Sequence, residues 1–169
     1  MSELAIRNRQ RTRAVNVRQL ERMAQLLLTE LLGLGDFELC VHLIRATQMA
    51  RLNALFLKHS GSTDVITFDH NETPPRDRVA GEIFISVDDA VVQARRFRTS
   101  WQSEIVRYVI HGVLHLRGLN DLTPAQRRII KREENRLLRQ IGRRFALKEL
   151  GRPRNLVETR QNSRRTPPH

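Results

Sequence analysis

Hydrophobic residues recur along the chain with two spacings, and their alternation predicts an interleaved series of strands and helices. From Phe37 to Ile44 apolar residues alternate onto one face, which is typical of a strand. From Trp101 to Leu116 they follow the spacing of three and four that is typical of a helix. Comparable patterns predict further strands at about 4–17, 64–68 and 82–87, and further helices at 17–32, 46–58, from 87 to a break near 99–100, and 124–141.

The interleaving is compatible with an α/β or an α+β fold, and we predict α+β: a small mixed β-sheet of about four strands packed against about five helices. The step Gly33-Leu34-Gly35 ends the first predicted helix. Thr123 is expected to cap the last helix, with Pro124 at its first position. The segment 70–79 holds two adjacent prolines and many charges, so we expect a loop there.

The chain has 169 residues, of which 40% are hydrophobic, and this is enough for one folded domain, which we assign to residues 1–150. Residues 151–169 are rich in arginine, proline and polar side chains, and we expect a basic, disordered tail. The net charge is +12, and fourteen basic against four acidic residues lie between Arg127 and His169. Such a field attracts polyphosphates, which favours a nucleic-acid partner over the alternative of a merely solubilising helix and tail.

Cys40 is the only cysteine, so the chain cannot form an internal disulfide, and its apolar surroundings predict a small buried hydrophobe. Residues 1–15 alternate basic and polar side chains without the apolar core of a secretion signal. We find no apolar stretch long enough to cross a bilayer. These features predict a cytoplasmic protein that does not enter a membrane.

His111 and His115 are four residues apart on a predicted helix, so both imidazoles face the same side and can meet one metal ion. Gly118 can end that helix and turn the chain back, which brings Asp121 within reach as a third ligand. Two imidazoles, one carboxylate and a water make up a known form of catalytic zinc site. The alternative is two structural histidines bonded to backbone carbonyls and an aspartate of the following loop. Gly112 replaces the glutamate of the HExxH pattern, which argues against peptidase chemistry.

The segment from His111 to Gly118 resembles the HGxLHLxGxDH signature of the YbeY family, the bacterial metal-dependent endoribonucleases of ribosomal RNA maturation. Upstream, Leu52-Asn53 followed by residues 62–68 is similar to the LN…PTDVLSF segment of that family. Residues 81–86 resemble its GDIVIS strand. The order and spacing agree from about residue 37 to residue 142.

The resemblance implies a YbeY-like, metal-dependent hydrolase domain in residues 1–150 and a metal site of His111, His115 and Asp121. Asp121 occupies the position of the third zinc histidine of the family, so we expect one divalent ion, zinc in the first place, with Mn²⁺ or Mg²⁺ also compatible with a carboxylate. The active-site arginine of the family falls on Leu57, and the neighbouring Lys58 is a candidate to replace it. We therefore name Lys58 and Asp121 as candidate catalytic residues, Asp121 being a ligand or the base that positions water.

Further candidates follow from the same resemblance. His59, Arg107 and Arg117 are candidates to hold phosphates, and Asp64 and Glu82 are candidates to accept hydrogen bonds from the ligands, although solvated surface roles are open for each.

Three functions remain in view. The first is a single-strand-specific endoribonuclease acting on ribosomal RNA or a ribosomal subunit, in rRNA maturation and ribosome quality control. The second is a non-catalytic RNA- or ribosome-binding factor that retains a metal site. The third is a metal hydrolase with a smaller substrate.

Overall fold

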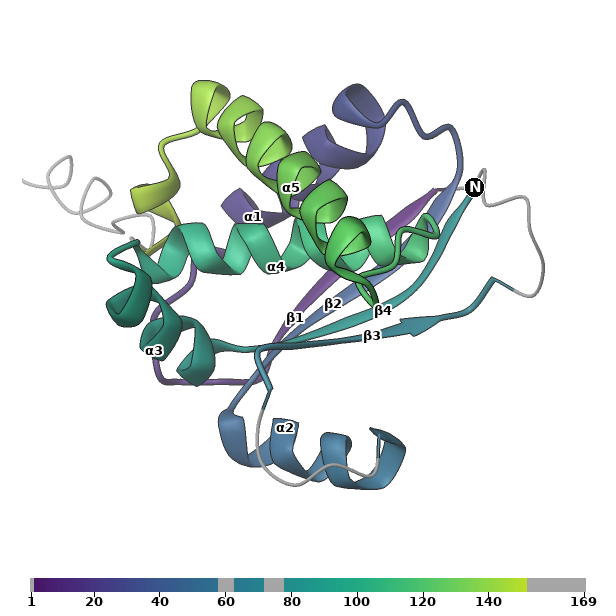
Figure 1. Ribbon diagram of the computed structural model, residues 1–169. Helices are drawn as coiled ribbons and strands as arrows, with labels where there is room; N and C mark the ends of the chain where they lie inside the picture. The colour runs from purple at the N-terminus through teal and green to yellow at the C-terminus, as the bar shows by residue number, and fades with distance from the viewer. Residues whose placement is uncertain (1, 58–62, 72–77, 152–169) are drawn as a thin grey trace, which may run out of the picture.

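The computed structural model describes residues 2–57, 63–71 and 78–151, in which helices cover both faces of one sheet (Figure 1). The sheet has four strands in the order β1-β2-β4-β3. β1 (Glu3–Asn8), β2 (Phe37–Ile44) and β4 (Val79–Ser86) are mutually parallel, and β3 (Val65–Asp69) runs antiparallel to β4. This mixed sheet confirms the predicted fold class.

In the described residues, five α-helices lie around the sheet, and α1, α2 and α5 are each followed by a short helical turn of another type. The bounds are α1 Val17–Leu26 with the π-turn η1 Leu27–Leu31, α2 Ala46–Leu52 with the π-turn η2 Asn53–Leu57, α3 Val87–Phe97, α4 Trp101–Leu116, α5 Pro124–Arg144 and the 3-10 turn η3 Leu147–Gly151. Among the described residues, no helix combines the length and apolar character that a membrane crossing needs.

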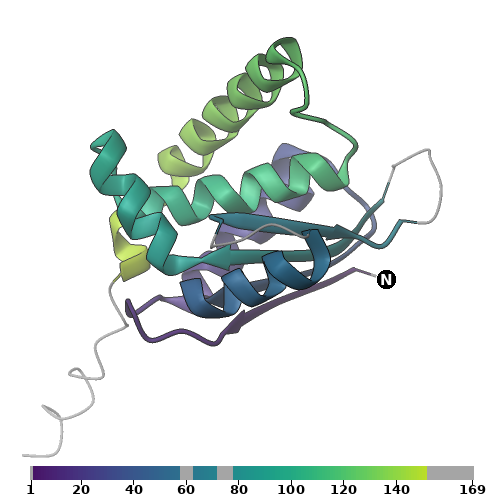
Figure 2. The same ribbon diagram turned by 60° about the horizontal axis from the view of Figure 1, so that its bottom comes forward.

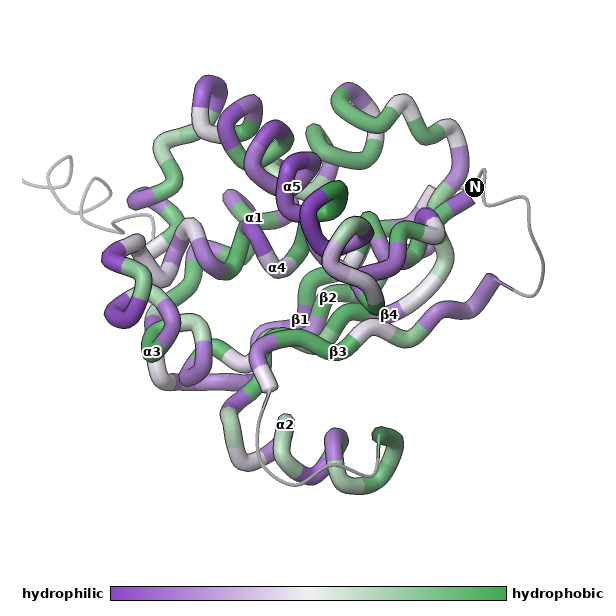
Figure 3. Tube along the Cα trace, in the orientation of Figure 1, coloured by the Kyte–Doolittle hydropathy of each residue, from purple (hydrophilic) through white to green (hydrophobic). Residues whose placement is uncertain are grey.

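α4 is the central helix of the larger layer. It lies across the sheet, with α5 packed on its outer side and α1 beside it, whereas α2 covers the opposite face (Figures 1 and 2). Alternate residues of β2 and β4, such as Val41 and Ile83, pack against α4 residues such as Val109 and Val113. α4 packs against other elements on several sides and buries apolar residues along most of its length. α5 packs on one side only, and its outer face is polar (Figure 3).

The small residues Gly112 and Gly81 let α4 approach β4 closely. A Cβ atom on Gly112 would lie 2.6 Å from Cδ1 of Ile83, and one on Gly81 would lie 2.3 Å from the backbone oxygen of Phe68 and 2.7 Å from Cδ2 of Leu116. The distance between α4 and the sheet, and hence the position of the histidines on α4, depends on these two glycines.

Gly81→Ala is expected to destabilise the fold by more than about 1–3 kcal/mol, the usual cost of overpacking, because the contacted oxygen belongs to the backbone and cannot rotate away. Urea unfolding measures the effect. Gly35→Ala is the matched control, since a Cβ there meets nothing within 4 Å. Equal unfolding free energies for the two variants would contradict the close approach of Gly81 to the backbone of β3 and to Leu116 of α4.

The predicted strand at 4–17 is wrong beyond Asn8. The side chain of Gln10 donates to the carbonyl of Arg13 at 2.8 Å and accepts from its amide at 3.1 Å, so the chain turns away from the sheet. Asn16 then caps α1. β4 starts three residues before the predicted position, because Val79 pairs with Phe37 of β2. Of the expected tail, Gly151 ends η3, and residues 152–169 lie outside the described residues.

Candidate metal centre

The last two turns of α4 present two histidines toward the same point. His111 and His115 are both about three-quarters buried, and their Nε2 atoms are 2.8 Å apart. The apolar residues around them form the core contact of α4, so the helix holds the imidazole pair at a fixed height above the sheet. Two nitrogens that converge in this way can share a metal ion.

The loop after α4 brings a carboxylate to the same point. Gly118, with φ of 97°, reverses the chain, and the amide of Leu119 donates to the carbonyl of Leu114 at 3.0 Å. Oδ2 of Asp121 then lies 3.4 Å from Nε2 of His115 and 3.7 Å from Nε2 of His111.

The start of α5 fixes the other end of this loop. Thr123 and Gln126 form a capping box, with Pro124 in the first turn, as the sequence predicts for Thr123 and Pro124. The guanidinium of Arg127 donates to the carbonyls of Asp121 and Leu122, both at 3.3 Å. Asp121 therefore sits on a short loop tied at both ends rather than on a free surface segment.

The spacing of the three ligand atoms suits a tetrahedral ion. Ligands at about 2.05 Å from zinc in tetrahedral directions are about 3.3 Å from one another, and the observed separations of 2.8, 3.4 and 3.7 Å bracket this value. His111, His115 and Asp121 form a group that could hold a metal ion. The structure thus brings together the three residues that the sequence suggests as ligands.

Glu134 also belongs to this site, although the sequence analysis did not predict it as a site residue. It lies on α5, is about nine-tenths buried, and accepts a short hydrogen bond from Nδ1 of His111. The carboxylate keeps the Nδ1 proton in place and leaves Nε2 free to face Asp121 and His115, which is the usual support of a metal-binding histidine. The helical spacing could have indicated that this carboxylate is buried, because Glu134 falls on the same face of α5 as the buried residues Ile130, Leu137 and Ile141.

The two imidazoles differ in their electrostatics. Burial lowers the pKa of His111, but the hydrogen bond and the negative charge of Glu134 more than offset this, so its pKa lies above the ordinary value. Burial and the charge of His111 hold the pKa of His115 below the ordinary value. His115 is therefore neutral near pH 7 and available as a ligand, and a metal ion at Nε2 of His111 would replace a proton there.

A second group of possible ligands, Cys40, His42 and Glu82, lies on the other face of the sheet. Nε2 of His42 is 2.9 Å from Glu82, but its buried Nδ1 has no hydrogen-bond partner among the described residues. A metal-binding histidine normally donates its second nitrogen to an acceptor, so the group on α4 is the better candidate. Cys40 is only partly buried and lies beside polar groups, so the predicted role as a buried hydrophobe is wrong.

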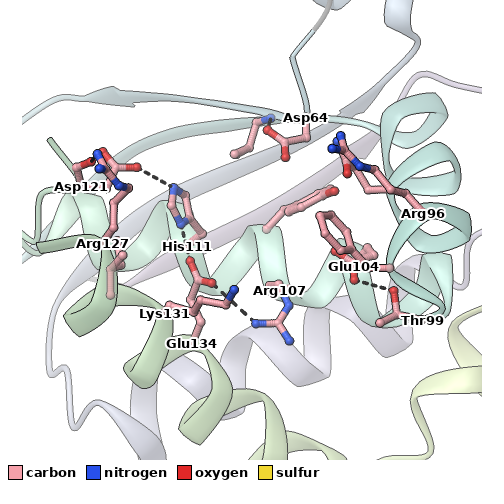
Figure 4. Close-up of a pocket in the computed structure, with 15 residues that line it drawn as sticks. Asp64, Arg96, Thr99, Glu104, Arg107, His111, Asp121, Arg127, Lys131 and Glu134 are labelled. Atoms are coloured by element: carbon pink, nitrogen blue, oxygen red, sulfur yellow. Dashed lines mark hydrogen bonds and ion pairs between the residues drawn. The ribbon is translucent and has the colours of Figure 1, made fainter. Parts of the chain in front are cut away.

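A cavity of about 660 Å³ opens beside His111 and Asp121 (Figure 4). Cationic side chains from three helices line it: Arg96, Arg107, Arg127 and Lys131. Arg107 is held by Asn135, whose side-chain oxygen accepts at 2.7 Å, and lies 3.6 Å from Glu134. A cavity with several fixed cations beside a possible metal centre is suited to phosphate groups.

The remaining sequence candidates fall in different places. Lys58 and His59 lie outside the described residues, and Leu57 ends η2 with an exposed side chain. Asp64 lines the cavity, but its carboxylate accepts from the amide of Val65 at 3.0 Å.

Two further sequence candidates do not reach the cavity. Glu82 faces away from it, toward His42 and His70, so the proposed support of the metal ligands by Glu82 is wrong. Among the described residues, Arg117 does not line the cavity.

The family model described as endoribonuclease YbeY matches residues 5–142. A protein of that name from Parabacteroides distasonis is 40% identical over 91 residues, which cover 54% of this chain and 62% of the relative. Another from an Anaeromyxobacter species is 33% identical over 136 residues, or 80% of this chain and 71% of the relative. The match thus spans less than two thirds of the length of the first relative. The solution structure of TM1509 from Thermotoga maritima has the same fold, with a TM-score of 0.61 and 24% identity over 82% of this chain and 89% of that one.

Proposed function

The chain belongs to the endoribonuclease YbeY family, and we propose that it is a single-strand-specific, metal-dependent endoribonuclease that acts in the maturation and quality control of ribosomal RNA. The observation that carries this proposal is the convergence of His111, His115 and Asp121 at the end of a cation-lined cavity. A ribosomal substrate would place the activity in the cytoplasm.

The proposed ligands are His111, His115 and Asp121, and zinc is the proposed ion, with Mn²⁺ or Mg²⁺ as alternatives that the carboxylate permits. When bound, an ion of this kind would supply Lewis-acid chemistry, in that it would lower the pKa of a water toward neutrality and polarise a phosphate oxygen. Glu134 orients His111, and the loop that Arg127 ties down holds Asp121 in place. Arg107 and Lys131 would bind the phosphates next to the bond that is cleaved.

Lys58 remains a proposed catalytic residue, as the cation nearest in sequence to the position where the family motif has arginine. The alternative function rests on Leu57 at that position: it is a protein that binds RNA or the ribosome through the same cavity and does not cleave. A side chain without charge cannot hold a phosphate as an arginine does. Leu57→Arg therefore tests the two readings, since it should raise the cleavage rate if the site is an enzyme weakened at this position.

Incubation of the purified chain with single-stranded and with structured RNA, before and after chelation, tests the proposed function. We expect cleavage of the single-stranded RNA, its loss after metal removal and its return on addition of zinc. Cleavage that persists after thorough metal removal would overturn metal-dependent catalysis. Salt-sensitive binding without cleavage by the metal-loaded protein would favour the binding factor.

Deletion of residues 152–169, which spares Gly151 and η3, is expected to weaken RNA binding and reduce its salt dependence. Each lost phosphate contact lowers the slope of log K against log salt by about 0.7 for single strands. Anisotropy titrations at several salt concentrations measure the slope. A full-length chain with glutamine at Arg152, Arg154, Arg160, Arg164 and Arg165 should behave like the deletion. An unchanged slope would show that the tail makes no phosphate contacts.

A further inference from the structure

We propose that the cavity continues from the metal centre into a nucleotide subsite, in which the ring of Phe97 stacks on one unpaired base and the hydroxyl of Tyr108 binds the same nucleotide. This inference rests on the proposed function, because it assigns a position to the RNA strand. Two independent observations carry it: an exposed aromatic ring, and a buried hydroxyl that has no hydrogen-bond partner within the described part of the chain.

Phe97 is the last residue of α3 and lines the cavity, yet 62% of it is exposed to solvent. The guanidinium of Arg96 lies over its ring, 5.6 Å from the centroid. An exposed aromatic ring with a stacked arginine at a cationic cavity is the usual platform for bases of single-stranded nucleic acid.

The corner that carries Phe97 is fixed before any ligand binds. Arg98 ends α3 in the left-handed conformation, with φ of 55°, and its amide donates to the carbonyl of Ala94. The hydroxyl of Thr99 donates to the buried carboxylate of Glu104 at 2.6 Å, which ties the start of α4 to the same corner. Because the backbone at this corner is fixed, only the side-chain rotations of Phe97 have to be ordered when a base stacks on its ring.

Tyr108 provides the second observation. Its side chain is buried and lines the cavity, but its hydroxyl has no hydrogen-bond partner among the described residues. Burial and nearby carboxylates raise its pKa, so the hydroxyl keeps its proton and remains a donor. A buried polar group without a partner is unfavourable, and a ribose or phosphate oxygen that enters the cavity and displaces the side chains covering this hydroxyl would satisfy it.

The arrangement of the cavity indicates a path for the strand. Arg96 lies at the end opposite Asp121, and the side chains of Arg107 and Lys131 lie between them (Figure 4). The base would stack at the end of the cavity formed by α3. The neighbouring phosphates of the strand would lie along Arg107 and Lys131 toward the metal ligands. A base inside a duplex cannot reach such a ring, so the subsite gives a physical reason for preferring single strands.

The test is the binding of a short 2′-O-methyl oligouridylate and of the same oligomer with abasic positions, measured by anisotropy with the full chain. A denaturing gel checks that the oligomers stay intact. We expect Phe97→Ala to weaken binding of the intact oligomer by about five- to a hundredfold and to leave binding of the abasic oligomer within twofold. Phe97→Trp should retain the affinity for the intact oligomer. The fluorescence of a 2-aminopurine placed in the oligomer should be quenched on binding to the unmodified protein and to the other variants, but not on binding to Phe97→Ala.

Val92→Ala is the matched control, since Val92 is also exposed on α3 and is not among the described residues that line the cavity. Tyr108→Phe should weaken both oligomers by about two- to tenfold and leave metal content unchanged.

Equal weakening of both oligomers by Phe97→Ala, or no weakening, would overturn the stacking role, and unchanged binding by Tyr108→Phe would overturn the hydroxyl contact. Binding that depends on Phe97 without cleavage by any variant would overturn the proposed nuclease activity alone. Cleavage without the difference between oligomers would overturn the subsite alone.

Discussion

His111→Ala is expected to lose the bound metal ion and to reduce RNA cleavage by at least about a thousandfold. A metal ion contributes several kcal/mol of transition-state stabilisation, and each 1.36 kcal/mol corresponds to a tenfold change in rate. The substitution removes one of three ligand atoms and also leaves the carboxylate of Glu134 buried without its main partner. Elemental analysis measures the metal content, and single-turnover cleavage of single-stranded RNA measures the rate.

His70→Ala is the control, because His70 is exposed and lies beside Glu82 on the other face of the sheet. It should keep both metal and activity. Asp121→Ala should lower the metal content less completely than His111→Ala, because two imidazoles remain. Metal content equal to that of the unmodified protein would remove Asp121 from the ligand set, and the same result for His111→Ala would overturn the metal centre.

The sequence was sufficient wherever a local pattern decides the structure. β2 and α4 have the predicted bounds, because the apolar periodicity that determines each of them lies within a single segment of the sequence. The same holds for the histidine pair, since four residues of a helix fix their relation. Gly118 and the capping box at Thr123 are also local signals, and together they place Asp121 close to the histidines.

The sequence was insufficient where contacts between distant segments decide. The alternation of basic and polar residues after Asn8 is compatible with an edge strand, but the side-chain hydrogen bonds of Gln10 turn the chain, and no periodicity of the sequence reveals this. The alternation of side chains along β4 places Glu82 on the face opposite to its neighbours in sequence, but only the sheet topology shows which of the two faces that is. The pairing of His111 with Glu134 joins residues on two different helices, so the spacing along one helix could not predict it.

These tertiary contacts also support the proposal that an aspartate serves in place of a third histidine. A carboxylate brings negative charge next to the histidines, and the buried Glu134 adds a second one on the far side of His111. Arg107 lies 3.6 Å from Glu134 and Arg127 holds the loop of Asp121, so each acid has a cation nearby. The proposed site would therefore favour a dication without leaving its own carboxylates uncompensated.

Glu134→Ala is expected to lower the affinity for the metal ion by about 10- to 100-fold, the usual effect of losing the residue that orients a metal-binding histidine. Without the carboxylate, the ring of His111 can rotate and its Nδ1 proton has no fixed acceptor, so Nε2 is less basic and less well aimed. Glu134→Gln should have a smaller effect, because an amide oxygen can still accept from Nδ1 but carries no charge. Competition with a chromophoric chelator measures the affinity.

Glu133→Gln provides the matched control for these variants. Glu133 is the neighbouring residue on α5, but its carboxylate pairs with Arg136 through bonds of 2.9 and 3.2 Å and faces away from the stripe that α5 buries. Its removal should leave the affinity for the metal unchanged. Thermal unfolding of the metal-free proteins shows whether a variant still folds. A variant that unfolds at the same temperature as the unmodified protein but binds the metal more weakly has lost the orienting hydrogen bond and not the fold. An affinity of Glu134→Ala equal to that of Glu133→Gln would contradict the role of Glu134 and would leave Nε2 of His111 oriented by the packing of α4 alone.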